Sequence, residues 1–192
     1  MGLAAHRHAY TFAEYLDLEG SSNVKHEFLE GAIYAMAGGT PRHAALTLAV
    51  AASLFNGLRG GSCRAFSSDL RIRVLASGFA GYPDVTVVCG ALEHDPASES
   101  TVTNPKLLVE VLSTSTQAFD LGEKFEHYKR IPTLQSVVYV WQDEIRVELR
   151  TRGSDGSWQS RTFQTGETIP LADIGCHLSV DEIYRDAAPP AG

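Results

Sequence analysis

Two acidic residues stand in segments that are otherwise apolar. Glu110 interrupts the run LLVEVL at 107–112, and Asp84 directly precedes the run VTVV at 85–88. An ionised carboxylate in an apolar strand costs several kcal/mol unless it is paired or bound to a metal. Taken singly, Asp84 is typical of a solvated or capping acid, and Glu110 of a buried ion pair. Together they favour one magnesium site, because acids on neighbouring strands can converge on a cation that needs one or two carboxylates.

A lysine and a run of hydroxyls follow the Glu110 segment. Lys124 lies near the apolar edge of the helix predicted for 117–130. Its ammonium would orient a water molecule or neutralise the charge of a phosphate in the transition state; the alternative is a side chain that extends outward to solvent. Ser113 opens the loop STST at 113–116, whose hydroxyls either cap that helix or contact substrate backbone.

Other polar residues offer contacts to phosphates. His43 stands near the start of a predicted helix, where it would donate to a phosphate, act as a general base, or serve in capping and packing. Arg71 and Arg73 alternate with apolar residues in a predicted half-exposed strand, and they either form a solvated face or contact phosphates. The sequence leaves these alternatives open.

The surrounding pattern predicts elements that position these residues. Thr40 and Pro41 open a long helix in which apolar residues recur every fourth position up to 58. A hairpin is expected over 25–36, strands over 82–89, 106–112, 137–141, 145–150 and 158–163, and a polar loop over 93–104. These elements predict one α/β (α+β) domain over residues 10–186, with a mixed sheet flanked by helices and flexible ends at 1–9 and 187–192.

The composition of the chain limits the classes of function that it can have. The 192 residues include 23 acids and 16 bases, a net charge of −7, which argues against a simple basic clamp for nucleic acid or an anionic membrane. It leaves room for a nucleic-acid enzyme whose acids gather at a metal. Three widely spaced cysteines without a CxxC pair predict reduced, mostly buried thiols. No apolar run approaches the roughly 20 residues of a membrane span, so we expect a cytoplasmic protein with no membrane partner.

Several segments in order resemble the Uma-two family of endonucleases, in the PD-(D/E)XK, or restriction-endonuclease-like, superfamily. They are 27–31, His43, 68–70, 83–84, 110–113, 115–116, Asp120, Lys124 and Tyr128.

The resemblance implies a restriction-endonuclease-like fold that cleaves DNA, expected to be duplex, with Mg²⁺ or a substituting Mn²⁺. Asp84 and Glu110 would be the metal carboxylates and Glu27 an accessory metal or water ligand. The superfamily's lysine, two residues after the glutamate, is Leu112 here, and Lys124 on the following helix would replace it. A homodimer or higher homo-oligomer is also implied.

Three functions therefore remain for comparison. The leading hypothesis is a metal-dependent DNA endonuclease. The alternatives are a nuclease-fold module without turnover, suggested by Leu112 and the acidic charge, and a hydrolase of a smaller phosphoester.

Overall fold

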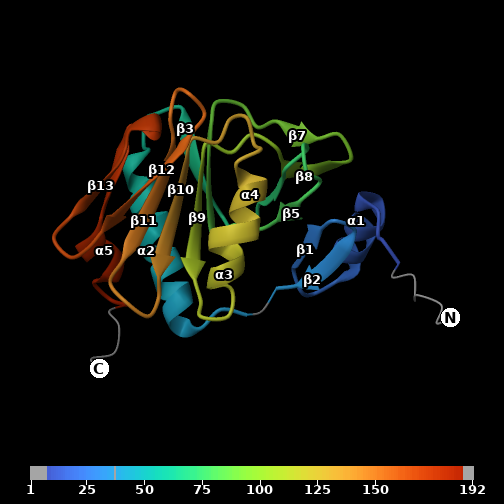
Figure 1. The fold of residues 1–192 in the computed structure, drawn as a ribbon, viewed down its shortest axis with the longest axis horizontal. Coiled ribbons are helices and arrows are strands. Elements are labelled where there is room, and N and C mark those ends of the chain that lie inside the picture. The colour runs from blue at the N-terminus through green and yellow to red at the C-terminus, as the bar shows by residue number, and fades with distance from the viewer. Residues whose placement is uncertain (1–7, 37, 188–192) are drawn as a thin grey trace.

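The computed structural model describes residues 8–36 and 38–187 (Figure 1). The flexible ends predicted at 1–9 and 187–192 lie outside these residues, apart from positions 8, 9 and 187. The described chain forms one mixed α+β domain in which helices flank mixed sheets, as the sequence predicts. None of its helices is long and apolar enough to cross a bilayer.

The larger core is built on a six-stranded sheet. Its strands lie in the order β12-β11-β10-β9-β6-β3, and only β9 and β10 run parallel to each other. The bounds are β3 (Cys63–Ser67), β6 (Val85–Cys89), β9 (Leu107–Leu112), β10 (Ser136–Trp141), β11 (Val147–Arg152) and β12 (Trp158–Phe163). β9 and β10 are buried at every position, as expected of central strands.

A second six-stranded sheet has the order β2-β1-β5-β4-β8-β7. Its strands are β1 (His26–Leu29), β2 (Ala32–Ala35), β4 (Arg71–Arg73), β5 (Ala80–Gly81), β7 (His94–Asp95) and β8 (Ser98–Val102). The polar loop expected over 93–104 is therefore wrong. Its polar residues hide a strand because Thr101 and Val102, both buried, pair in parallel with β4.

Side chains cap the starts of two helices, and the start predicted at Thr40 and Pro41 is confirmed. α2 (Pro41–Gly57) begins with Thr40 as its N-cap, whose hydroxyl accepts a hydrogen bond from the His43 amide. α1 (Phe12–Ser21) begins with a capping box between Thr11 and Glu14. The remaining short elements are β13 (Thr168–Leu171), η2 (Ala172–Ile174), β14 (Cys176–Ser179) and α5 (Val180–Tyr184).

Two helical layers enclose the larger sheet. Leu46, Val50 and Leu54 of α2 pack on one face with the odd-numbered residues of β9. The other face is covered by a helix in three parts, namely α3 (Gln117–Phe119), the π-helix η1 (Asp120–Lys124) and α4 (Phe125–Tyr128). In Figure 1 this second layer lies between β9 and β5 of the second sheet. Since side chains alternate along a strand, Glu110 faces the second layer.

The cysteines depart from the expectation of three reduced thiols. Cys63 and Cys89 form a disulfide, and only Cys176 is free among the described cysteines. The sequence separation of 26 hides the pairing in the sequence, but β3 and β6 are antiparallel neighbours and their register places Cys63 opposite Cys89.

Candidate active site

Glu110 projects from the middle of β9 into a nearly closed environment and is only 5% exposed. Its Oε1 accepts a hydrogen bond of 2.5 Å from the Tyr128 hydroxyl and lies 3.0 Å from Lys124 Nζ. Burial raises the pKa of Glu110 to about 8, and the charge of Lys124 opposes that rise. The negative charges of Asp120 and Asp84 add to it. The site therefore holds a carboxylate that gains from a further cation.

Lys124 brings three carboxylates together. Its Nζ lies 2.9 Å from Glu27 Oε1, 3.0 Å from Glu110 Oε1 and 3.3 Å from Asp120 Oδ1, and the residue is 3% exposed. Burial alone would lower the pKa of Lys124, but the carboxylates, Glu110 foremost, hold it well above its ordinary value. One permanent ammonium thus faces three acids, which leaves negative charge uncompensated. The side chain does not extend outward.

The π-helix η1 positions Asp120 and Lys124 in the site. Asp120 and Lys124 are its first and last residues, four positions apart, and Tyr128 follows after four more. The carbonyl of Asp120 accepts a hydrogen bond from the Tyr139 hydroxyl at 3.2 Å, and that of Leu121 accepts one from Arg150 at 2.9 Å. Side chains of the sheet thus satisfy backbone groups in a turn of a kind often found at functional sites.

Glu27 reaches the site from the second sheet. It lies on β1, which pairs with β5, and a Cβ atom at Gly81 of β5 would stand 3.1 Å from Glu27 Oε1. The glycine therefore leaves room for the carboxylate. Glu27 Oε1 is buried, and the Lys124 ammonium 2.9 Å away is the cation that faces it. The Lys124 ion pairs join the two sheets at this point.

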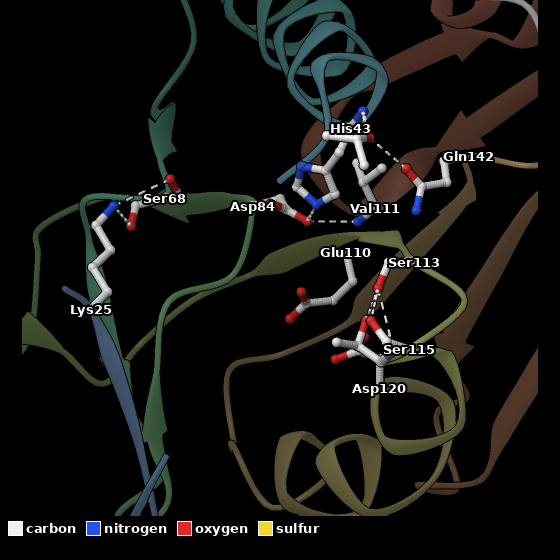
Figure 2. Close-up of polar contacts among 12 residues, drawn as sticks. Lys25, His43, Ser68, Asp84, Glu110, Val111, Ser113, Ser115, Asp120 and Gln142 are labelled. Carbon is white, nitrogen blue, oxygen red and sulfur yellow. Dashed lines mark hydrogen bonds and ion pairs between the residues drawn. The ribbon is translucent and has the colours of Figure 1, made fainter. Parts of the chain in front are cut away.

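Asp84 and His43 form the opposite wall. Asp84 Oδ2 accepts a hydrogen bond of 2.7 Å from the Val111 amide and lies 3.4 Å from His43 Nε2. The hydrogen bond with Asp84 raises the pKa of His43, while burial opposes the rise. Figure 2 shows His43 and Asp84 on one side of β9, and Glu110 projecting from the other side. Asp84 is thus fixed beside the Glu110–Val111 peptide.

Three further predicted residues lie in different places. Ser113 bonds to the hydroxyls of Ser115 and Thr116 at 3.0 and 2.9 Å, at the entrance to α3. Arg71, in the second sheet, is 6% exposed and not the solvated residue of the alternative reading.

The donors of Arg71 are already engaged. They bond to Tyr82, Ser98, Ser100 and Thr101. Arg73 lies 3.4 Å from Asp95 and stacks over the ring of Phe12. The structure brings Asp84, Glu110, Lys124, Glu27 and His43 to one region and directs these two arginines to the second sheet.

The donor set fits a hard divalent cation held by two carboxylates. Within the described residues, the hydrogen bonds and ion pairs of Glu110 fall on Oε1 and those of Asp84 on Oδ2. One oxygen of each carboxylate thus remains available to a cation of the kind that takes one or two carboxylates. Within the described part of the chain, no group of three or more His, Cys, Asp or Glu side chains is placed to hold a metal ion.

Sequence reasoning assigned no role to Asp120 and none to the Tyr128 hydroxyl. The available signal was the spacing of four between Asp120, Lys124 and Tyr128, which places polar groups along one helix face. The apolar pattern of the same helix concealed it, because Tyr128 also packs in the core.

Comparison with known proteins gives consistent matches. A family model named Uma2 and described as "Putative restriction endonuclease" matches residues 12–181. The chain is 37% identical over 175 residues to "Uncharacterized protein slr1290" of Synechocystis sp. (strain ATCC 27184 / PCC 6803 / Kazusa), covering 91% of both chains. It is 36% identical over 148 residues to "Uncharacterized protein sll1609" of the same organism, covering 77% of this chain and 84% of that one.

A solved structure shows the same fold. It is described as "a putative nuclease belonging to DUF820 from Anabaena variabilis ATCC 29413" and superposes with a TM-score of 0.75 at 18% identity. The match covers 91% of this chain and 97% of that one.

Proposed function

The chain belongs to the Uma2 family, which is described as "Putative restriction endonuclease", and we propose from its site that it is a metal-dependent endonuclease acting on DNA. The observation that carries the proposal is the Lys124 ammonium 3.0 Å from Glu110. The superfamily motif implies a lysine beside the metal-binding glutamate. In this chain the strand position for that lysine is Leu112, and the π-helix supplies an ammonium at Glu110 instead.

The residues divide the work as follows. Asp84 and Glu110 would hold Mg²⁺ or Mn²⁺, which when bound lowers the pKa of a coordinated water and offsets charge on the scissile phosphate. Lys124 positions the attacking water or stabilises the negative charge that develops at the phosphate. Glu27 and Asp120 hold Lys124 in place. His43 fixes Asp84 and presents its ring near the start of α2, where a phosphate would meet a donor.

We propose duplex DNA as the substrate and a homodimer as the acting form, because cleavage of both strands needs two sites. Net charge gives no general attraction to DNA, so binding depends on local cations, to which a bound metal would add. We therefore expect binding that weakens steeply with salt.

Cleavage of a supercoiled plasmid in Mg²⁺ or Mn²⁺ tests the proposal. Asp84→Asn and Glu110→Gln should each lower the rate by at least about a hundredfold, since each removes a metal carboxylate. Glu126→Gln is the matched control, because Glu126 is exposed on the same helical layer and pairs with Lys129. Equal residual cleavage in all three variants would mean that the activity belongs elsewhere.

Binding experiments separate the alternatives. A module without turnover would bind DNA and show no metal-dependent cleavage. A hydrolase of smaller phosphoesters would act on a model diester and bind duplex weakly.

A further inference from the structure

An exposed aromatic ring stands beside the site and takes no part in the core. Tyr34 on β2 is 55% exposed. β2 is the edge strand of the second sheet, so one side of it has no neighbouring strand among the described elements. A single exposed tyrosine is ordinary on a protein surface. Tyr34 differs from an ordinary exposed tyrosine because of its position in the sheet.

The sheet register places Tyr34 directly opposite Glu27. Opposed residues of an antiparallel pair project from the same face, with their Cβ atoms about 5 Å apart. Glu27 turns its carboxylate to Lys124 at 2.9 Å. On the opposite face of the same hairpin, Phe28 and Ile33 pack under α1 with Tyr15. Tyr34 thus stands on the site face of the hairpin, and its ring remains open to solvent.

The helix that follows β2 in the chain also contributes to the site, because His43 of α2 lies 3.4 Å from Asp84. Because Tyr34 shares a face with Glu27, which lies 2.9 Å from Lys124, a strand of DNA whose phosphate reaches Lys124 would pass Tyr34 on the side formed by the hairpin.

We infer that the Tyr34 ring stacks on an unpaired base next to the scissile phosphate, so that within duplex DNA the enzyme prefers sites that are locally unpaired. The inference rests on the proposed function for the position of the phosphate. The Tyr34 ring would act as an aromatic platform, because every base offers a π-face that can stack on an exposed ring without a hydrogen bond. Such a contact discriminates base pairing and not base sequence.

Fluorescence anisotropy with labelled oligonucleotides in EDTA, where no metal-dependent cleavage interferes, tests the inference. The probes are a single strand, a duplex with one unpaired base and the fully paired duplex. Tyr34→Ala should weaken binding of the first two by roughly 5- to 100-fold, with little change for the paired duplex. Tyr34→Phe should bind as the wild type does, because stacking needs the ring and not the hydroxyl.

Tyr10→Ala is the matched control. Tyr10 is 40% exposed, and its amide bonds to Gly31 at the turn of the same hairpin, away from Glu27. Equal affinities for Tyr34→Ala and Tyr10→Ala, or equal losses on all three probes, would overturn the inference. So would a wild-type protein that binds none of the probes.

The cleavage assay separates the inference from the proposed function. If the wild-type protein binds DNA but never cleaves it, and Tyr34→Ala selectively loses binding of the unpaired probes, the stacking role of Tyr34 is supported and only the proposed nuclease activity is refuted. If the protein cleaves DNA and Tyr34→Ala has the same KM as the wild type for strands with an unpaired base, only the stacking role is refuted.

Discussion

Replacement of Lys124 by methionine separates the role of its charge from that of its packing. Methionine keeps an unbranched chain of similar length but removes the ammonium that lies within 3.3 Å of Glu27, Glu110 and Asp120. Removing one partner of a buried ion pair costs about 3–5 kcal/mol, because the remaining charge is left without compensation. We expect the metal-free Lys124→Met protein to lose that much free energy of unfolding.

The same substitution should strengthen metal binding while it abolishes cleavage. The ammonium and a divalent cation are both attracted to Glu110, so its removal should tighten Mn²⁺ binding by about 10- to 100-fold, or roughly 1.4–2.7 kcal/mol. Mn²⁺ at a hundred times its Kd would then return about 2.7 kcal/mol of stability. Lys124 would be needed for the reaction and yet oppose the metal in the resting protein.

Titration calorimetry with Mn²⁺ and urea unfolding with and without Mn²⁺ measure both effects. Lys129→Met is the control, since Lys129 lies on the surface of the same layer and pairs only with Glu126 at 2.6 Å within the described residues. Mn²⁺ binding by Lys124→Met that is equal to or weaker than that of Lys129→Met would refute the competition between ammonium and metal.

Three further outcomes follow from the same geometry. Burial raises the pKa of Glu110 from 4.5 to about 8, so the native protein holds a proton that the unfolded chain releases, and the free energy of unfolding should fall as pH rises across that interval. Urea unfolding at several pH values should show a smaller dependence of this free energy on pH for Glu110→Gln than for the wild type. An equal dependence in both proteins would refute the shift. Gly39→Ala places a Cβ atom 2.8 Å from His43 Nδ1, so it should move the ring away from Asp84 and reduce cleavage, whereas Gly38→Ala, which meets nothing within 4 Å, should not. Reduction of the Cys63–Cys89 disulfide, which spans 26 residues, should lower the free energy of unfolding by about 3.5 kcal/mol in the chain-entropy account, and dithiothreitol without effect on the unfolding midpoint would contradict the bond.

The sequence predicted the parts of the fold that depend on local chemistry. Thr40 and Pro41 mark the start of α2 by capping and a fixed φ angle, and the apolar spacing of four marks its buried face. The β1–β2 turn was predictable from Glu30-Gly31, and both residues adopt positive φ. Each of these signals lies within a few residues of the feature it specifies.

The features that the sequence did not predict depend on distant residues. The strand β8 forms because β4 pairs with it, and the disulfide because β3 and β6 share a register. Arg71 seemed solvated because arginine usually is, but hydroxyls from β8 satisfy its guanidinium in the interior.

The candidate site divides in the same way. Glu110 and Lys124 were identifiable because charge interrupts an apolar pattern, and their ion pair at 3.0 Å explains how both are tolerated in the interior. Asp120 was not identifiable, because its role depends on a π-turn that hydrogen bonds from Tyr139 and Arg150 support.

The cleavage rate of the two lysine variants at saturating Mg²⁺ tests the central claim most directly. If the π-helix supplies the lysine of this nuclease site, Lys124→Met should cleave at least about a hundredfold more slowly than the wild type, in the range seen when one stabilising donor is removed. Lys129→Met should stay within about twofold, because an exposed ion pair contributes little. Cleavage by Lys124→Met at the rate of Lys129→Met would contradict the account.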